Sequence, residues 1–379
     1  MNIFIIARGY PSKQEPTWGC FEKDQADALS KLGHKVTILS VDTRFRWYWR
    51  TLGVEYKMDD TLAIYNIFLL PYALLFFLPK RLKDWLYTWQ LEYLFKRAVQ
   101  TEGMPDILYA HYLYNTQKCI PIRNKYHIPL VGIEHWSQMG MRPIAKSIVK
   151  LATNIYESTD KLLTVSSALR ENILAEIGVD STVVPNIVGQ EFYYRPKTYR
   201  TPVVRIVATG RLVKGKGFEL LIRTIPTLKH PIELNIIGNG AERQRLQQLI
   251  HTLHIEDRVH LLGYKTKEEV VNILQDSDLF VLPSESETFG VAYIEALACG
   301  VPIIATDCGG PRDILTPFNG TLIPINDQNA LAQAITRMID HLQDYDRELI
   351  AQDCQKRFAS TSIAQQLIAI FEEVISQNN

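Results

Sequence analysis

The chain has 379 residues, more than one ordinary hydrophobic core accommodates, so two domains are expected. Its composition, 46% hydrophobic and 22% charged, indicates a globular protein and excludes a disordered or fibrous one. The 41 basic and 41 acidic residues cancel, so no overall charge favours nucleic acid as a partner. Five cysteines without a CxxC pair favour reduced thiols and a cytoplasmic location.

The first half of the chain alternates short apolar strands with helical segments. Residues 2–7 are predicted as a strand, since this short apolar run lacks the basic region that precedes it in a signal peptide. A helix is predicted over 20–32, where Gly33 gives a stop signal. Further strands are predicted over 35–41, 106–110, 128–134 and 161–166. This alternation favours a parallel sheet covered by helices on both faces.

One uncharged stretch, residues 62–78, raises the question of a membrane span. A spanning helix needs about 20 apolar residues. This stretch is shorter, contains Pro71 near its middle and is followed by Pro79. We therefore do not expect it to cross a membrane.

The alternation pauses over 184–202, a polar stretch with prolines that is typical of a linker. It then restarts, with strands predicted over 205–210, 232–238, 258–263, 278–283 and 301–306. The fold class is therefore α/β, with two doubly wound Rossmann-like domains over 1–190 and 191–361. An amphipathic helix within 362–379 is expected to pack back on the first domain. The carboxyl ends of the two sheets, where ligands bind, can then face each other across a cleft.

The stretch SESETFGVAYIEALACG places two carboxylates at a predicted strand end and in the helix that follows. Glu287 lies in the turn, where the N–H groups of Thr288, Phe289 and Gly290 form a helix N-terminus that favours an anion. Glu295 lies about two turns further along, on roughly the same side. A buried carboxylate needs strong partners, and the two hydroxyls of a ribose would serve. The alternative is that Glu295 pairs with a nearby cation and that Glu287 is ordinary loop polarity.

A basic loop, ATGRLVKGKGFELL, follows the first strand of the second domain. Arg211 comes directly after this strand and Lys216 precedes a helix, so both are predicted at the carboxyl edge of the sheet. Two positioned cations neutralise a diphosphate without a metal. The alternative is a solvated loop. Glycine loops at 8–19 and 236–243 are weaker signals, because neither contains GxGxxG.

These segments together resemble a known family. Glu287 to Glu295, followed by ALACGVPIIAT, resembles the E-x7-E segment of GT-B glycosyltransferases, specifically the family 4, or group 1, retaining enzymes. The basic loop resembles the phosphate-binding loop of that family. The likeness is specific over 203–315 and diffuse over the first half of the chain.

The resemblance implies roles for these residues. Arg211 and Lys216 would hold the diphosphate of a nucleotide sugar, Glu295 its ribose and Glu287 a hydroxyl of the donor sugar. The implied donor-binding residues are Gly19, Arg211, Lys216, Glu287, Thr288, Phe289, Gly290 and Glu295, and the implied catalytic residues are His111, Glu287, Arg211 and Lys216.

The predicted strand DILYAH resembles the family's strand that ends in H-x-H, and His111 would then lie near the reacting carbon. Tyr109 stands at the first histidine position, so only His111 matches. Glu134 and His135 end the next strand and are expected on the acceptor side. For His135 a structural role is an equal alternative.

No metal or other cofactor is predicted. The triplet Asp276-Ser-Asp278 is similar to a metal-binding DxD motif, but it bridges a helix end and a strand start, where Asp276 can solvate the turn. His251 and His254 form a lone pair on a polar helix and lack the wider ligand spacing of a zinc site.

Aromatic and basic residues interleave over 44–50 and again over 80–97. Trp and Tyr favour the membrane interface, and basic residues favour anionic headgroups. The alternative is that the rings pack the core and the charges are solvated. An anionic membrane surface is therefore a possible partner, which would make the protein peripheral on the inner face of the plasma membrane.

The function expected from the resemblance is transfer of a sugar, with retention, from a nucleotide-diphosphate sugar. The acceptor would be a hydroxyl of a glycan or lipid-linked molecule in bacterial surface polysaccharide synthesis. Two alternatives remain open: a GT-B nucleotide-sugar epimerase, and a non-catalytic nucleotide-sugar-binding partner. No clear second carboxylate pair supports the epimerase, and the presence of Glu287, Arg211, Lys216 and His111 together argues against a non-catalytic chain.

Overall fold

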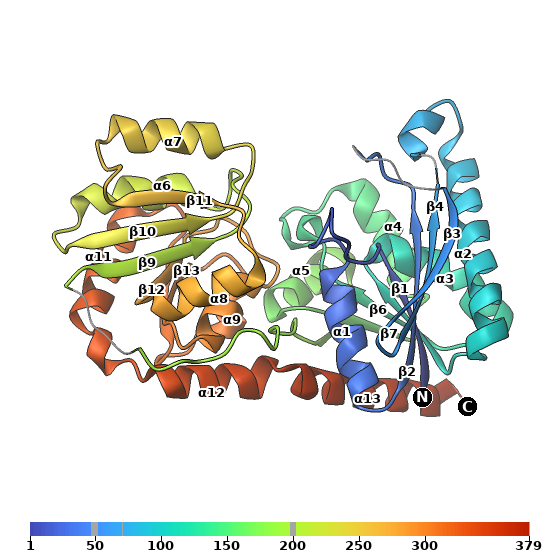
Figure 1. Cartoon of the computed structure of the whole chain (residues 1–379). Helices are drawn as coiled ribbons and strands as arrows, with labels where there is room; N and C mark the ends of the chain where they lie inside the picture. The colour runs from blue at the N-terminus through green and yellow to red at the C-terminus, as the bar shows by residue number, and fades with distance from the viewer. Residues whose placement is uncertain (47–51, 70, 198–201, 379) are drawn as a thin grey trace. The chain divides into compact units, whose positions relative to one another are not determined.

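The computed structural model describes residues 1–46, 52–69, 71–197 and 202–378 (Figure 1). Contacts between residues group the chain into two compact units. Unit 1 comprises Met1–Val165, Arg170–Ile187 and Ser360–Asn379, and unit 2 comprises Ser166–Leu169 and Val188–Ala359. The sequence predicted a division between residues 190 and 191 and a terminal helix on the first domain. In unit 1, the terminal helix packs against the first helix.

Unit 1 contains an eight-stranded sheet in the order β3-β4-β2-β1-β5-β6-β7-β8. Its strands are β1 (Asn2–Ala7), β2 (Lys35–Asp42), β3 (Gly53–Asp59), β4 (Leu62–Phe68), β5 (Ile107–His111), β6 (Leu130–Glu134), β7 (Lys161–Thr164) and β8 (Thr182–Val183). Its helical segments are α1 (Cys20–Lys31), η1 (Tyr72–Leu75), α2 (Lys80–Glu102), α3 (Leu113–Tyr126), η2 (Ser137–Gly140), α4 (Lys146–Tyr156), α5 (Ser167–Ile177) and α13 (Ser360–Asn378). All neighbouring strands are parallel except β3 and β4.

The uncharged stretch at 62–78 forms a strand and a short 3-10 turn. Strand β4 is fully buried, which explains its lack of charge, and β3 pairs with it as an antiparallel hairpin. The turn of this hairpin contains Asp60 at φ 54°. The sequence did not predict β3, whose residues are mostly exposed and polar. Among the described residues, no helix is long and apolar enough to cross a membrane.

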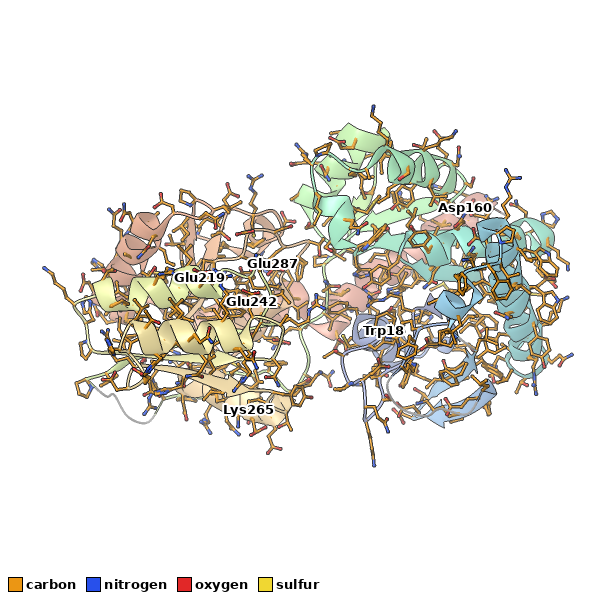
Figure 2. All side chains as sticks on the ribbon, turned by 90° about the horizontal axis from the view of Figure 1, so that it is seen from above. Trp18, Asp160, Glu219, Glu242, Lys265 and Glu287 are labelled. Carbon is orange, nitrogen blue, oxygen red and sulfur yellow. The ribbon has the colours of Figure 1, made fainter. Side chains whose placement is uncertain are left out.

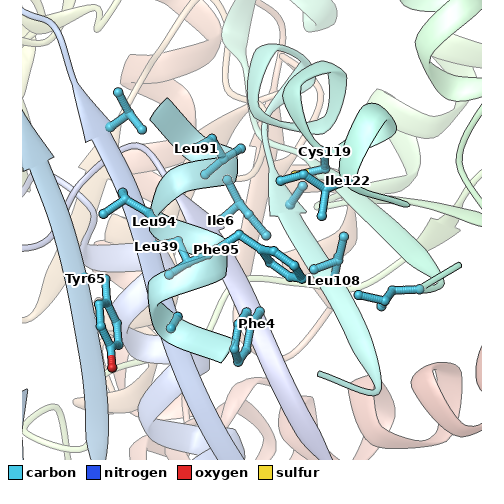
Figure 3. Packing of buried hydrophobic residues seen from close by; sticks show 14 of the residues in the cluster. Phe4, Ile6, Leu39, Tyr65, Leu91, Leu94, Phe95, Leu108, Cys119 and Ile122 are labelled. Atoms are coloured by element: carbon cyan, nitrogen blue, oxygen red, sulfur yellow. The ribbon is translucent and has the colours of Figure 1, made fainter. Parts of the chain in front are cut away.

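The core of unit 1 lies between its sheet and helix α2. Leu91, Leu94 and Phe95 of α2 point toward the strands and meet Phe4 of β1 and Leu108 of β5 in one buried cluster (Figure 3). The rings of Phe4 and Phe95 meet edge to face with centroids 5.8 Å apart. Burial of this apolar face, at about 25 cal/mol per Å² removed from water, stabilises α2 on the sheet.

Unit 2 contains a six-stranded parallel sheet in the order β11-β10-β9-β12-β13-β14. Its strands are β9 (Val204–Thr209), β10 (Ile232–Ile237), β11 (Val259–Gly263), β12 (Leu279–Leu282), β13 (Ile303–Thr306) and β14 (Gly320–Ile323). Its helical segments are α6 (Phe218–Thr224), η3 (Ile225–Thr227), α7 (Arg243–Thr252), α8 (Lys267–Asp276), α9 (Val291–Ala298), α10 (Pro311–Ile314), α11 (Gln328–Asp340), η4 (Leu342–Asp344) and α12 (Arg347–Phe358).

The predicted fold class, with two Rossmann-like α/β domains, is confirmed. Among the parallel strands of each sheet, the strand order reverses direction once, between β9 and β12 in unit 2 and between β1 and β5 in unit 1. Loops at the carboxyl ends of the two strands then diverge, one to each face of the sheet, and leave a crevice that binds ligands in this class of fold. The loops after β9, β12, β1 and β5 are therefore where functional side chains are expected.

Candidate active site

The loops that follow β9 and β12 are held together by their backbones. The N–H of Glu285 donates to the carbonyl of Gly215 at 2.7 Å. Gly217 has φ 71°, and a Cβ at this position would lie 1.9 Å from the carbonyl oxygen of Pro283. Only glycine allows this approach, because it has no Cβ and adopts positive φ freely. The contact fixes Lys216, which precedes Gly217, over the loop after β12.

Lys216 and Glu287 form an ion pair across these two loops. The Lys216 Nζ lies 2.6 Å from Glu287 Oε1, and the hydroxyl of Ser284 donates to the same oxygen at 2.8 Å. The side chain of Lys216 is 26% exposed and that of Glu287 is 11% exposed. The sequence predicted both residues at the carboxyl edge of the sheet but did not predict that they touch. Glu287 is labelled in Figure 2.

The N-terminus of α9 lies next to Glu287. Gly290 is its N-cap, with φ 103° and no side-chain cap. Among the described residues, the N–H groups of Thr288, Phe289 and Gly290 have no hydrogen-bond partner. Free N–H groups and the helix dipole together favour an anion at such an end. The side chain of Phe289 is buried, so only its backbone could serve the predicted role.

Glu295 lies in α9 and is half-buried rather than fully buried. Its neighbours Ile294 and Ala296 are fully buried, so the carboxylate emerges at the edge of the core. Its predicted contact with a ribose remains a prediction.

Arg211 follows β9 after one glycine, as predicted. Its backbone region is fixed, since the N–H of Leu212 donates to the carbonyl of Asn239 at 2.9 Å. Its side chain is exposed and makes no hydrogen bond or ion pair within the part of the chain that the structure describes. The guanidinium is therefore available for an anionic ligand, with the planar fork of donors that suits phosphate.

In unit 1, the loop after β1 returns to α1 through Gly19. Gly19 is the N-cap of α1 at φ 78°, and a Cβ there would lie 2.3 Å from the carbonyl oxygen of Gly9. The indole N–H of Trp18, a residue labelled in Figure 2, donates to the carbonyl of Arg8 at 3.0 Å and closes the loop. The structure thus places Gly19 at a tight crossing of the loop, while its contact with donor phosphates remains a prediction.

Sequence reasoning assigned no role to Arg8, which the structure places at the end of β1. Its guanidinium lies 3.8 Å from the ring centroid of Tyr112 and 4.8 Å from that of Trp18. Its Nε pairs with Oε1 of Glu22 at 3.0 Å, and Glu22 is fully buried. The signal was present in the sequence, because Arg8 follows the first strand of its sheet much as Arg211 follows the first strand of the other.

His111 and His135 lie in a ladder of five aromatic rings. The rings of His111 and His135 are stacked, with centroids 5.2 Å apart and planes inclined by 7°. Phe21 stacks on the far side of His135 at 5.9 Å, and Tyr109 meets His111 at 4.7 Å. Phe371 of α13 closes the ladder against Tyr109 at 5.1 Å. Tyr109 therefore replaces a histidine with a ring that reaches the terminal helix.

Both histidines are held in the neutral form. Burial, followed by the charge of Arg8, lowers the pKa of His111 to about 3. Burial, followed by His111, lowers the pKa of His135 well below its ordinary value. The ring nitrogens of His111 have no hydrogen-bond partner among the described residues. A neutral imidazole with free nitrogens can still accept or donate a hydrogen bond to a ligand.

Glu134, predicted on the acceptor side, accepts hydrogen bonds from the protein at both carboxylate oxygens. Its Oε1 accepts from the N–H of His135 at 2.9 Å and of Trp136 at 2.8 Å. Its Oε2 accepts from the N–H of Leu113 at 3.0 Å and from the hydroxyl of Tyr156 at 2.8 Å. The carboxylate is fully buried and four protein donors occupy it, so this placement favours a structural role at the start of α3 over contact with an acceptor.

The DxD-like triplet has structural partners. Asp276 pairs with Arg195 at 3.1 Å, and Asp278 pairs with Lys197 at 2.5 Å and accepts from the N–H of Arg205 at 2.9 Å. Both aspartates are thus engaged at the amino end of β12, away from the loops after β9 and β12. Within the described ranges, no cluster of three or more candidate ligands could hold a metal ion.

The aromatic–basic run at 44–50 falls partly outside the described residues, which exclude 47–51. The two arginines that are described, Arg44 and Arg46, both pair with Glu15 and Asp42. Arg44 also lies over the ring of Trp18, 3.4 Å from its centroid. These two guanidinium groups are therefore paired with carboxylates of unit 1, whereas the sequence predicted that they would contact a membrane surface.

Two family models match adjacent parts of the chain. The model described as "Glycosyltransferase Family 4" matches residues 23–192, and the model described as "Glycosyl transferases group 1" matches residues 196–352. The second match contains the basic loop and both glutamates of the E-x7-E segment.

The chain is similar to several known proteins. It is 29% identical to the "Putative teichuronic acid biosynthesis glycosyltransferase TuaC" of Bacillus subtilis, with 89% of each chain covered. Among solved structures, sucrose-phosphate synthase from Thermosynechococcus elongatus has a TM-score of 0.79 at 21% identity, with 99% of each chain covered. The HepE protein of Anabaena, solved with UDP-glucose, has a TM-score of 0.72 at 18% identity, covering 98% of this chain and 100% of HepE. With two Rossmann-like units and both family models matched, the chain belongs to the group 1 glycosyltransferases of the GT-B fold.

Proposed function

We propose that unit 2 binds a nucleotide-diphosphate sugar at the carboxyl ends of β9 and β12. The observation that carries this proposal is the ion pair of Lys216 and Glu287 beside the free N–H groups of residues 288–290. A diphosphate needs positive charge and hydrogen-bond donors, whereas sugar hydroxyls need a carboxylate acceptor. This edge of the sheet offers all three within adjacent loops.

The ion pair does not prevent Lys216 from binding phosphate. An ammonium group has three N–H donors, and Glu287 uses one of them, so a phosphate oxygen can take another. Glu287 in turn has a second carboxylate oxygen beside the one that accepts from Ser284 and Lys216. Arg211 adds a guanidinium that is free of protein partners in the described structure. We propose that these two cations stabilise the leaving diphosphate and that transfer needs no metal.

The acceptor we propose is a hydroxyl of a glycan or lipid-linked molecule in bacterial surface polysaccharide synthesis, and transfer occurs with retention. Resemblance to the retaining family 4 enzymes supports retention, and similarity to the putative teichuronic acid biosynthesis glycosyltransferase of Bacillus subtilis supports the process. The Anabaena protein solved with UDP-glucose makes UDP-sugars the first donors to test. His111 remains the predicted residue near the reacting carbon.

A thermal-shift screen against UDP-, GDP- and ADP-sugars tests donor binding. We expect at least one donor to raise the melting temperature of the wild type and to have little effect on Lys216→Ala or Arg211→Ala. Lys229→Ala is the matched control, since Lys229 is also exposed and unpaired among the described residues but lies between η3 and the start of β10, at the opposite edge of the sheet. Equal shifts in Lys216→Ala and the control would overturn the assignment, as would the absence of a shift with any donor.

Turnover assays separate the proposal from its alternatives. With donor alone, a transferase leaves the donor sugar unchanged or slowly hydrolyses it, whereas an epimerase converts it to its epimer, which NMR detects. Turnover with an acceptor should survive EDTA. Loss of turnover in EDTA with recovery in manganese would show that the metal-free mechanism is wrong and would reopen the roles of Asp276 and Asp278.

A further inference from the structure

Exposed apolar side chains form a stripe over residues 74–77, at the end of η1 and just after it, and along one side of α2. Phe76 is 82% exposed and Trp85 is 59% exposed. On α2 the stripe advances by three or four residues a step, which keeps it on one side of a helix. We call this surface the aromatic stripe; its members are Leu74, Phe76, Phe77, Leu82, Trp85, Trp89 and Tyr93.

The aromatic stripe and the core-facing side of α2 are formed by different residues. The core face of α2 is formed by other residues, Leu91, Leu94 and Phe95, which are fully buried against the sheet. Helix α2 is therefore apolar on two opposite sides, whereas a helix at the surface of a globular protein presents polar residues to water. Contiguous exposed apolar surface of this kind marks a binding face.

Basic residues flank the stripe, and its acidic neighbours are neutralised. Between residues 74 and 97 the sequence has five basic and two acidic residues. The two carboxylates are each paired, Asp84 with Lys118 at 2.9 Å, and Glu92 with Lys96 at 3.1 Å and Lys125 at 2.5 Å. The surface around the stripe therefore carries a net positive charge.

Two of the flanking cations have no protein partner. Arg81 and Lys83, in the first turn of α2, make no ion pair or hydrogen bond within the described part of the chain. At the other end of the stripe, the one side-chain hydrogen bond of Arg97 within the described ranges is to the hydroxyl of Tyr93, at 3.3 Å. These groups are free to approach phosphate groups on a partner surface.

The residue types favour a lipid surface over a protein. The cores of protein interfaces are depleted in lysine, whereas amphipathic surfaces that lie on bilayers combine lysine and arginine with Trp, Phe and Leu. Trp89 and Tyr93 are stacked with ring centroids 6.4 Å apart, and such amphipathic rings partition to the headgroup region. We propose that the aromatic stripe docks unit 1 on the surface of an anionic lipid bilayer, with Arg81, Lys83 and Arg97 on the headgroups.

This inference deepens the proposed function, because a lipid-linked acceptor would lie in the same bilayer. It places the membrane surface on residues 74–97 alone, because Arg44 and Arg46 are engaged by Glu15 and Asp42. Binding to lipid and binding to donor are measured separately, so either can fail while the other holds.

Co-sedimentation with vesicles tests the docking. Vesicles of phosphatidylcholine with phosphatidylglycerol should sediment the full chain at low salt, and vesicles of phosphatidylcholine alone should not. We expect Trp85→Ala with Trp89→Ala to weaken binding at least about tenfold, because the apolar area that enters the bilayer falls. Arg81→Gln with Lys83→Gln should weaken it about 25-fold at low salt, or about fivefold for each charge, and less as salt rises. Lys229→Gln and Tyr264→Ala, both exposed in unit 2, are the matched controls.

Each result decides the proposal. Quenching of tryptophan emission by brominated lipid, lost in Trp85→Phe with Trp89→Phe while sedimentation persists, would place these two rings in the bilayer. Absence of binding to either vesicle, or equal binding to both, would overturn it. Concentration-dependent dimers that the alanine pair abolishes, without vesicle binding, would instead assign the stripe to a second copy of the chain. The donor-induced thermal shift should be unchanged in every stripe variant, which shows that each one folds.

Discussion

Alanine at Gly217 should damage the donor site, whereas alanine at Gly215 should only strain the backbone. The two glycines flank Lys216 and both have left-handed φ, 79° at Gly215 and 71° at Gly217. An alanine at either position costs about 1–2 kcal/mol for this conformation. They differ in their surroundings, because the nearest atom to a Cβ at Gly215 is a carboxylate oxygen of Glu285 at 3.7 Å, whereas at Gly217 it is the Pro283 carbonyl oxygen at 1.9 Å.

The close contact sets the size of the second effect. A Cβ essentially never lies within about 3 Å of a backbone oxygen, so the loop must move by about 1 Å to admit Gly217→Ala. The added overpacking costs about 1–3 kcal/mol more than Gly215→Ala. The displacement also carries Lys216 away from Glu287, and misplacement by about 1 Å can cost about 100-fold in rate.

Urea denaturation and donor turnover measure the two effects. We expect Gly215→Ala to lower the free energy of unfolding by about 1–2 kcal/mol and to retain most of its turnover. Gly217→Ala should lose more stability and about 100-fold in turnover. If both variants lose the same stability and the same turnover, the contact with Pro283 does not position Lys216, and the reasoning is refuted.

Three further predictions follow from single side chains. Lys216→Met should lower kcat/KM about 100-fold, the cost of one lost electrostatic donor, while Lys229→Met should not change it; equal rates would contradict the role of Lys216. Because burial lowers the pKa of His111 to about 3 from the ordinary 6.5, the unfolded chain takes up a proton that the folded chain does not, and stability is lost as pH falls below about 6.5. This one side chain should cost about 2 kcal/mol at about pH 5, so urea titrations of wild type should show a steeper decline between neutral pH and about pH 5 than those of His111→Phe; parallel declines would argue against a neutral buried imidazole. Tyr109→Phe removes the hydroxyl that donates to Gln25 Oε1 at 2.7 Å and should cost about 1–3 kcal/mol of stability, with no change in the donor-induced thermal shift.

The layout of the donor site was predictable because it depends on local order. Strand, turn and helix follow one another in the sequence, and the carboxyl ends of parallel strands share one edge of the sheet. That rule placed Arg211, Lys216 and Glu287 at the same edge. It could not predict the ion pair between residues 216 and 287, since this contact depends on how far each loop extends over its neighbour.

The GxG at Gly238 and Gly240 illustrates a signal that sequence reasoning considered weak. In the structure a Cβ at Gly238 would lie 1.9 Å from the carbonyl oxygen of Gly210, and one at Gly240 would lie 2.2 Å from that of Leu212. Both glycines therefore make room for the basic loop that carries Arg211. A spacing pattern alone does not show which backbone passes over a glycine.

Glu134 shows why roles in unit 1 were harder to predict. A carboxylate at the end of a buried strand is expected near a ligand, but whether its lone pairs are already taken depends on groups distant in sequence, such as the hydroxyl of Tyr156. Strand β3 escaped prediction for a similar reason, because its polar residues pair with a buried strand only at one edge of the sheet.

The placement of α13 has a consequence for synthesis. Unit 1 contains residues 1–165, 170–187 and 360–379, so residues 188–359 of unit 2 are inserted between the body of unit 1 and its last helix.

 Residues 188–359 of unit 2 therefore leave the ribosome before the last helix of unit 1 does. Domains generally fold as they emerge, with the N-terminal one first. Unit 1 cannot complete its fold until α13 has been translated. Until then, the surfaces of α1 and Tyr109 that α13 and its Phe371 cover remain exposed to water. Unit 2 is therefore the first unit able to complete its fold during synthesis. Unit 1 is the one whose exposed surfaces a chaperone on the nascent chain would need to cover.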